Sequence, residues 1–241
     1  IITNGFLFSD QILSELKEVN IESVAISLDG PENIHDRFRQ KGSFRRAMQA
    51  MDTLTQNNIL VSIISTLSPQ NIHHLEELYQ ILKGKQIFAW QLQACSPMGN
   101  ALGKNFPTEI DFSEVIQFVE AHIENISFSV GVADNIGYFT ESEGYVRGNT
   151  SGKAYFRGCQ AGLTTIGIDS IGNVRGCESM YDTLFIEGNL RERTLSEIWN
   201  DPDAFAYNRQ FTKAWLTGKC STCDYGSRCA GGCRSDGSPD G

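Results

Sequence analysis

The cysteines of this chain constrain its fold more than any other feature of the sequence. Six of the seven cysteines fall into two groups, and four of them lie within fourteen residues near the carboxyl-terminal end. The first group is Cys159 and Cys177, and the second is Cys220, Cys223, Cys229 and Cys233. A hydrophobic core does not require thiols at this density. The spacing therefore predicts that the fold gathers these side chains around metal.

Three chemistries use closely spaced cysteines, and features of this sequence weigh against two of them. A zinc ribbon uses two C-x-x-C pairs, whereas Cys229 and Cys233 have three residues between them. A disulfide framework is typical of small secreted chains with an even number of cysteines, and no signal-peptide pattern is recognisable here. Iron–sulfur clusters take thiolates from a tight run together with distant partners. We predict iron–sulfur ligation and keep zinc and disulfides as alternatives.

The composition narrows the classes of partner. The 241 residues carry a formal net charge of −9 and show no basic stripe, which argues against a surface for nucleic acid. The longest apolar runs, such as Ile59 to Ile64, have the length of strands, so we expect no membrane span. Thiols that must stay reduced suit the cytoplasm, which is the location we expect.

Residues 1 to about 95 alternate between strand and helix patterns. We expect strands at Ile1–Thr3, Ser23–Asp29, Ile59–Leu67 and Ile87–Ala94. We also expect a helix capped by Ser9 or Asp10, helices capped by Ser43 and Asn71, then a helix over 106–126 and a strand over 127–133. Short connections between such steps imply right-handed crossovers and a parallel sheet. Small or polar residues at every second position of Ser23–Asp29 favour a barrel with an occupied lumen over a doubly wound sheet.

The pattern changes in residues 140–158, which are rich in Gly, Ser and Thr and lack periodicity. We place a domain boundary here, which gives domains of residues 1–139 and 140–241. In the second domain, residues 164–168 and 173–177 predict a hairpin, and Thr194 is expected to cap a helix that reaches Trp199.

The cysteine spacing resembles that of a known family. The tail reads C-x2-C-x5-C-x3-C, and the segment from Cys159 through Gly172 to Cys177 reads C-x12-G-x4-C. Together they resemble the SPASM domain of radical S-adenosylmethionine (SAM) enzymes, as do the intervening residues 188–190 and 195–199.

Markers of the same family occur in order along the first domain. They are Thr3-Asn4-Gly5, Ser27-Leu-Asp29-Gly30, His35-Asp36-x-x-Arg39 and Pro97-x-Gly99. The resemblance implies an α/β fold: a partial (β/α) TIM-like barrel containing strands three to six, followed by a small α+β SPASM domain.

Four residues of these markers are candidates for contact with SAM. The resemblance places Asn4, Ser27, Asp29 and Arg39 near the cofactor. A hydroxyl and a carboxylate at a strand end suit a ribose or an amino-acid head group, and Arg39 suits a carboxylate. The simpler alternative makes Asp29-Gly30-Pro31 an ordinary turn and Arg39 a solvated helix residue.

The resemblance also divides the cysteines between two auxiliary [4Fe–4S] clusters. It assigns Cys159, Cys177 and Cys233 to the first cluster and Cys220, Cys223 and Cys229 to the second. Each set is one ligand short. Residues 153–158 contain no cysteine that would complete the first set, and the family pattern puts the last ligand of the second beyond Gly241.

The catalytic motif of the family, C-x3-C-x2-C, is absent between Ile1 and Gly241, and Cys95 does not replace it. In the family, the cluster bound by this motif reduces SAM to a 5′-deoxyadenosyl radical. We expect that the chain is a fragment, that the motif lies in missing barrel strands, and that the fragment alone is inactive.

The resemblance implies a radical SAM/SPASM oxidoreductase-type maturase that abstracts hydrogen from a peptide or protein, with flavodoxin or ferredoxin as electron donor. Glu178 follows Cys177 at the position of a base in sulfatase maturases, and burial would raise its pKa; a solvated Glu178 is the alternative. Formylglycine formation in sulfatases is the second hypothesis for the function. A non-catalytic peptide-binding module stabilised by zinc or a cluster is the third.

Overall fold

The computed structural model describes residues 1–96, 108–122, 127–136, 141–147 and 155–235. The chain divides into two compact units, the first of Ile1–Ile136 with Thr140–Tyr155, the second of Gly137–Phe139 with Phe156–Gly241. The domain boundary at residue 140 stays a prediction, because residues 137–140 lie outside the described ranges. Among the described helices, none has both the length and the apolar character needed to cross a bilayer.

The first unit contains the expected parallel sheet. Its five strands lie in the order β1 (Ile2–Thr3), β2 (Ser23–Ser27), β3 (Leu60–Leu67), β4 (Ala89–Ala94) and β5 (Ser129–Val132). Each strand pairs in parallel with the next strand along the chain. Sequential parallel strands joined by helices are the arrangement of a (β/α) barrel, so the predicted fold class is confirmed.

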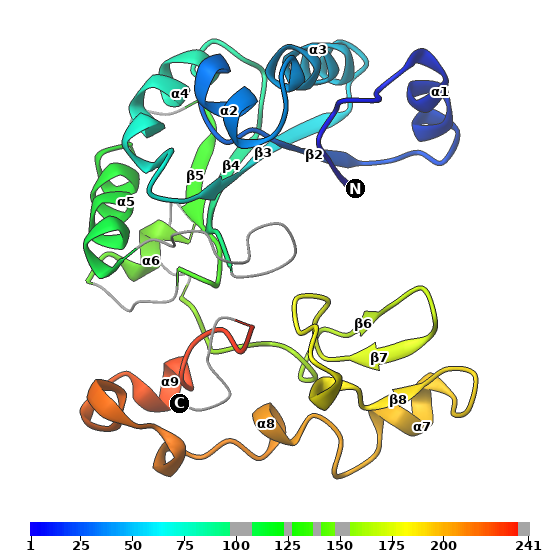
Figure 1. The fold of residues 1–241 in the computed structure, drawn as a ribbon, viewed down its shortest axis with the longest axis vertical. Helices are drawn as coiled ribbons and strands as arrows, with labels where there is room; N and C mark the ends of the chain where they lie inside the picture. Colours follow the sequence, from blue (N-terminus) through cyan, green and yellow to red (C-terminus); the bar gives the residue numbers. More distant parts are fainter. Residues whose placement is uncertain (97–107, 123–126, 137–140, 148–154, 236–241) are drawn as a thin grey trace. The chain divides into compact units, whose positions relative to one another are not determined.

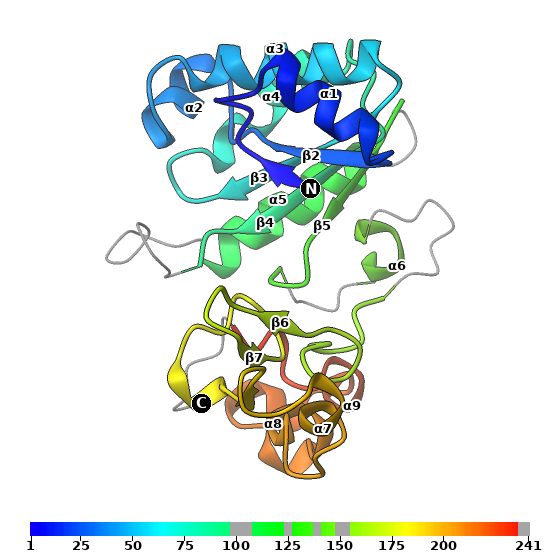
Figure 2. The ribbon, with the colours of Figure 1, turned by 90° about the vertical axis from the view of Figure 1, so that its right-hand side faces the viewer.

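Helices connect these strands, and one more helix follows the last strand. They are α1 (Asp10–Glu18), α2 (Glu32–Phe38), α3 (Ser43–Gln56), the 3₁₀ turn η1 (Ile72–His74), α4 (Leu75–Leu82), α5 (Glu109–His122) and α6 (Glu143–Val146). Helices α2 to α5 run along one side of the sheet (Figure 1), which the turned view also shows (Figure 2). Helix α2 was not among the expected elements.

The two faces of the sheet differ as the alternation in Ser23–Asp29 predicted. Ile26, Ile63, Trp90 and Val130 form one row across four strands, and each is at most 4% exposed. This row belongs to the core that includes helix residues such as Leu54. In the next row, Ser27 and Ile64 are half-buried, Gln91 is exposed and Gly131 is buried. The small and polar residues therefore share the face opposite the core.

Two expected helix caps differ from the structure. Ser43 is the first residue of α3, and the carboxylate of Asp36 receives the N–H groups of Gly42 at 2.6 Å and Phe44 at 2.9 Å. Burial alone would raise the pKa of Asp36, but the N–H groups of Phe44 and Gly42 outweigh it and lower this pKa. Asn71 precedes η1 without capping it, since its side chain is used elsewhere.

The second unit is small and built from short elements. Strands β6 (Gly167–Ile168), β7 (Asn173–Arg175) and β8 (Gly188–Asn189) form an antiparallel sheet, and six short helices follow or interrupt it. These helices are η3 (Thr183–Phe185), α7 (Leu195–Trp199), α8 (Ala206–Arg209), η4 (Lys213–Trp215), η5 (Gly218–Thr222) and α9 (Gly226–Cys229). The expected hairpin is present with shorter strands, and Thr194 caps α7. The core cluster consists of Val174, Ile198, Ala204 and Phe205.

Candidate cofactor and cluster sites

The carboxyl ends of β1 and β2 bring two candidate cofactor residues to one edge of the sheet. Thr3 pairs with Ile26, so Asn4 and Ser27 follow at the same level. Asn4 is exposed, and its Oδ1 accepts the N–H of Phe6 at 3.0 Å, which closes the turn after β1. Ser27 is half-buried. The marker residues Pro97 and Gly99 lie outside the described residues.

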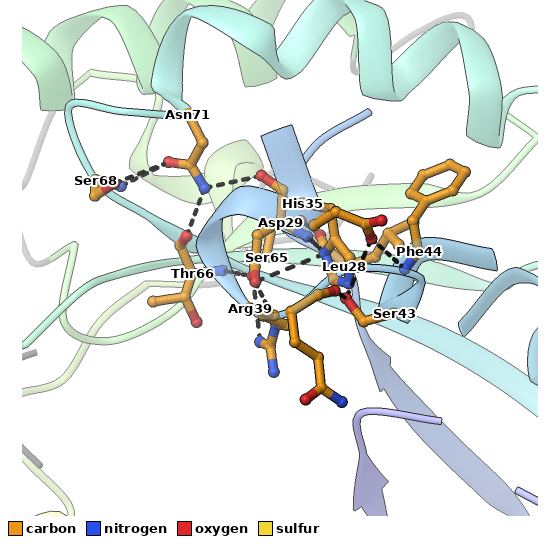
Figure 3. A network of polar contacts seen from close by, with 12 residues as sticks. Leu28, Asp29, His35, Arg39, Ser43, Phe44, Ser65, Thr66, Ser68 and Asn71 are labelled. Atoms are coloured by element: carbon orange, nitrogen blue, oxygen red, sulfur yellow. Dashed lines mark hydrogen bonds and ion pairs between the residues drawn. The ribbon is translucent and has the colours of Figure 1, made fainter. Parts of the chain in front are cut away.

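Asp29 lies at the centre of a buried polar network just beyond β2 (Figure 3). Its Oδ2 accepts from Nε of Arg39, and its Oδ1 accepts from the N–H of Thr66 at 2.9 Å and from Nη2 of Arg39 at 3.4 Å. The Asp29 side chain is 0% exposed, whereas that of Arg39 is 28% exposed. The carboxylate therefore faces the interior and holds the guanidinium, part of which reaches the surface.

His35 supports this network from α2. Its Nδ1 accepts the backbone N–H of Asp29 at 3.0 Å, so the ring proton is assigned to Nε2 and the ring is neutral. Burial lowers the pKa of His35, and the charge of Asp29 opposes this only in part. The His35 Nε2 atom is buried and has no hydrogen-bond partner among the described residues.

The β3 end of the site contains two residues that the sequence analysis did not assign to it. Nδ2 of Asn71 donates to the carbonyl oxygens of Asp29 and Thr66, both at 2.8 Å, and its Oδ1 accepts the N–H of Ser68 at 2.7 Å. Ser65 donates to the carbonyl of Leu28. Asn71 was identified only as a helix cap, because its partner Asp29 lies 42 residues away along the chain.

This arrangement determines what each side chain can do. Asp29 has its oxygens occupied by internal donors, so it orients Arg39 and fixes the ends of β2 and β3. Arg39 presents a positive charge that suits a carboxylate or phosphate. Direct contact of Asn4, Ser27, Asp29 or Arg39 with SAM stays a prediction.

The first thiol group consists of Cys159, Cys177 and Cys233, all in the second unit. A hydrogen bond with the thiol of Cys233 is the main reason that the pKa of Cys159 is lowered, to about 5, while burial opposes it. Cys177 accepts the N–H of Ser179 at 3.5 Å. Burial raises the pKa of Tyr207, and charges on Glu187, Cys159 and Cys177 add to it. Tyr207 thus lies near two cysteines of this group.

The second thiol group consists of Cys220, Cys223 and Cys229. Backbone hydrogen bonds link it into consecutive turns, from the N–H of Cys223 to the carbonyl of Cys220 and from the N–H of Gly226 to that of Cys223. Burial raises the pKa of Cys229, and charges on Cys220 and Cys223 raise it further. Cys159 thus lies next to Cys233, and Cys229 lies near Cys220 and Cys223. The division of all six cysteines between two clusters stays a prediction.

The side-chain chemistry of the two groups fits iron–sulfur ligation. Each offers three thiols and, in the first, one thiol already favours its anion, which is the form that binds metal. All seven cysteines are present as thiols. Within the described ranges, no group of three or more His, Cys, Asp or Glu side chains has the spacing for a single metal ion.

Glu178, the predicted base, is exposed in this structure. It lies beside β6, since a Cβ atom on Gly167 would be 2.8 Å from its backbone nitrogen and 3.0 Å from its Oε1. The burial expected for Glu178 is not observed. Its role as a base stays a prediction.

The fold and the thiol groups define an iron–sulfur protein with a partial α/β barrel, and comparison with known proteins gives its family. Residues 1–82 match the radical SAM superfamily, and residues 159–224 match the SPASM iron–sulfur cluster-binding domain. The two matches identify a radical SAM region in residues 1–82 and a SPASM domain in residues 159–224.

Relatives of several activities share this architecture. The AdoMet-dependent heme synthase of Oleidesulfovibrio alaskensis is 28% identical over 247 residues, which cover 97% of this chain and 62% of that protein. The cysteine-type anaerobic sulfatase-maturating enzyme of Clostridium novyi is 25% identical over 246 residues, covering 98% of this chain and 64% of that protein. The chain thus spans somewhat more than three fifths of the length of these two relatives.

A solved structure with the same fold is SuiB of Streptococcus suis. It superposes with a TM-score of 0.74 at 16% identity, covering 98% of this chain and 56% of SuiB. SuiB bound to its precursor peptide SuiA gives a TM-score of 0.71 at the same identity, covering 98% of this chain and 54% of SuiB. At this low sequence identity, the similarity shows only that the two proteins share a fold.

Proposed function

We propose that this chain is part of a radical SAM/SPASM enzyme whose second unit holds two [4Fe–4S] clusters. The observation that carries the proposal is that thiols which the cysteine spacing assigns to the same cluster interact with each other in that unit. Cys159 and Cys233 share a hydrogen bond, and Cys229 interacts with Cys220 and Cys223. Two separate sets of three thiols suit two clusters better than one zinc ion.

Anaerobic reconstitution with iron and sulfide tests the clusters. Cys177→Ala removes a ligand of the first group and Cys223→Ala a ligand of the second. We expect each variant to lose most of the iron of one cluster, about four atoms per chain. Cys95→Ala is the control, because Cys95 is a buried cysteine outside both groups.

The opposite results would be equally clear. Zinc bound in place of iron, or equal iron contents in Cys177→Ala, Cys223→Ala and Cys95→Ala, would reject the two clusters. Loss of all iron in both ligand variants would indicate one shared site.

We further propose that Asn4, Ser27 and Arg39 contact SAM and that Asp29 acts by holding Arg39. The half-exposed guanidinium and the common edge of β1 and β2 support this assignment. SAM bound there would supply the radical chemistry by which hydrogen is abstracted from the substrate. That chemistry is proposed only for protein that also contains the C-x3-C-x2-C motif, which residues 1–241 lack.

The substrate we propose is a peptide or protein. The sulfatase-maturating relative supports it, and so does the peptide complex of the similarly folded SuiB. Glu178 would act as the base that removes a proton from the substrate. The Glu178 side chain is exposed and therefore accessible to a substrate. Flavodoxin or ferredoxin would supply electrons in a reducing, cytoplasmic setting. Formylglycine formation in a sulfatase is the particular reaction that the relative of C. novyi suggests.

A heme precursor is the second candidate substrate. It is favoured by the 28% identity to the heme synthase of O. alaskensis, which extends over 97% of this chain. Formation of 5′-deoxyadenosine, measured with candidate peptides and with heme precursors, distinguishes the two. Stimulation by a heme precursor alone would overturn the peptide assignment. If protein that also contains the C-x3-C-x2-C motif and carries all its clusters formed no 5′-deoxyadenosine, a binding module would be favoured.

A further inference from the structure

Tyr207 places a buried hydroxyl group beside the first thiol group. A Cβ atom on Gly176 would lie 2.3 Å from the Tyr207 oxygen and 2.8 Å from the carbonyl carbon of Ala161. Gly176 immediately precedes Cys177, and Ala161 lies two residues after Cys159. The hydroxyl therefore occupies space that only a glycine leaves open, between the backbones that carry two cysteines.

This hydroxyl is buried. The backbone N–H of Gly176 interacts with its oxygen, whereas its own proton has no acceptor among the described residues. A buried donor without an acceptor destabilises the folded state. The ring itself does not explain the tyrosine, since its edge-on contact with Phe185, at 5.4 Å between centroids, would be made equally by phenylalanine. The hydroxyl lies where a cluster bound by the first thiol group could supply the acceptor that it lacks.

Three groups that become anions on losing a proton lie near Tyr207, namely the carboxyl group of Glu187 and the thiols of Cys159 and Cys177. Glu187 is itself partly buried, which raises its pKa, and its carboxylate is engaged by the backbone of Phe205. The two thiols are the proposed ligands of the first cluster. A bound cluster would bring charged sulfur atoms to the place where the hydroxyl lacks an acceptor.

We propose that the Tyr207 hydroxyl donates a hydrogen bond to a sulfur atom of the cluster held by Cys159, Cys177 and Cys233, and so sets the reduction potential of that cluster. The inference rests on the proposed function, because it requires the cluster. A hydrogen bond to sulfur stabilises the reduced cluster, which carries more negative charge, and thus raises the potential. Tyr207 is in this sense a positioning and tuning residue.

Redox titration of the reconstituted chain, followed by electron paramagnetic resonance, tests the proposal in Tyr207→Phe. We expect the ratio of reduced to oxidised first cluster to fall about tenfold at fixed solution potential, which is about 59 mV for a one-electron couple. The second cluster should keep its potential. Tyr181→Phe is the matched control, because the Tyr181 side chain is 66% exposed and lies four residues after Cys177.

A second measurement reports the bond directly. Reduced wild-type protein in D₂O should show an exchangeable deuteron coupled to the first cluster, and Tyr207→Phe should lose this coupling. If Tyr207→Phe kept its iron and showed unchanged potentials and couplings, the role of Tyr207 would be overturned. A Tyr207 hydroxyl that donates to Glu187 instead of the cluster would give this result. Absence of iron from the first group in wild-type protein would reject the proposed function instead.

Discussion

Asp29 and Arg39 are the residues in which burial and charge are most closely linked. The carboxylate is fully buried, and it is neutralised by a guanidinium and by a backbone N–H group. Removing one partner of such a pair leaves a charge without compensation in the interior. Asp29 therefore has a structural role that does not depend on any cofactor.

Asp29→Asn should destabilise the first unit by about 3 kcal/mol, because Arg39 loses its buried counter-charge. Urea denaturation followed by circular dichroism measures the loss. Glu32→Gln is the control: Glu32 pairs with Arg45, but the two side chains are 46% and 80% exposed, so the free energy of unfolding should hardly change. Equal effects of the two substitutions would contradict the assigned role of Asp29.

His35 should make the stability of the chain depend on pH. Burial lowers its pKa in the folded state below the ordinary value of 6.5, so the unfolded chain binds a proton that the folded chain resists. The free energy of unfolding should therefore fall as the pH drops below about 6.5. Charges of Asp29, Asp36 and Arg39 modulate this shift.

Urea denaturation at several pH values checks this expectation. His35→Gln should reduce the decline in stability between neutral and mildly acidic pH. The control His73→Gln changes an exposed ring that pairs with Glu114, and the decline should persist. An identical pH dependence in wild-type and His35→Gln would show that His35 does not contribute.

At the scale of elements, the short connections of the second unit hold the thiol groups in place. Gly158 precedes Cys159 and has a φ of +82°, and a Cβ atom there would lie 2.9 Å from Cβ of Ala230 and 3.0 Å from the carbonyl oxygen of Cys229. The segments before the first group and after the second therefore pack against each other at a glycine.

Gly158→Ala should destabilise the second unit and lower its iron content. Gly218→Ala is the control, because Gly218 also has a positive φ, of +53°, but a Cβ atom there meets nothing within 4 Å. Both variants bear the strain of a positive φ, about 1 kcal/mol, and only Gly158→Ala adds the clash. Thermal denaturation and iron analysis measure the difference. Equal losses would mean that packing at Gly158 is unimportant.

At the scale of the whole molecule, the two units differ in what stabilises them. The first unit has an extended apolar core beneath its sheet, whereas the core cluster of the second consists of four buried residues. So small a core needs a further source of stability, and bound metal supplies such energy in small domains.

Removal of iron by chelation should therefore unfold the second unit locally and leave the first intact. Hydrogen exchange with mass spectrometry should show faster exchange in residues 155–235 and unchanged protection in strands β2 to β4. Cys95→Ala with its iron intact serves as a reference for a variant that disturbs neither cluster. Equal loosening of both units, or of neither, would contradict the expectation.

Much of this organisation is visible in local sequence patterns. The spacing of six cysteines predicts their division into two groups, and the alternation in Ser23–Asp29 predicts which face of the sheet is buried. Patterns of this kind repeat over a few residues, so a single strand or turn expresses them. Helix α2 escaped prediction because its seven residues are too few to establish a period.

The sequence by itself determined the family of this protein, the order of its strands and the identity of its candidate ligands. The tertiary structure alone decided how the polar residues are used: that Asp29 faces Arg39 and Thr66, that Asn71 joins the ends of two strands, and that Tyr207 lies against Gly176. The reason is physical. These partners lie from 5 to 42 residues apart along the chain, and only folding places a donor within reach of its acceptor or a ring over its glycine.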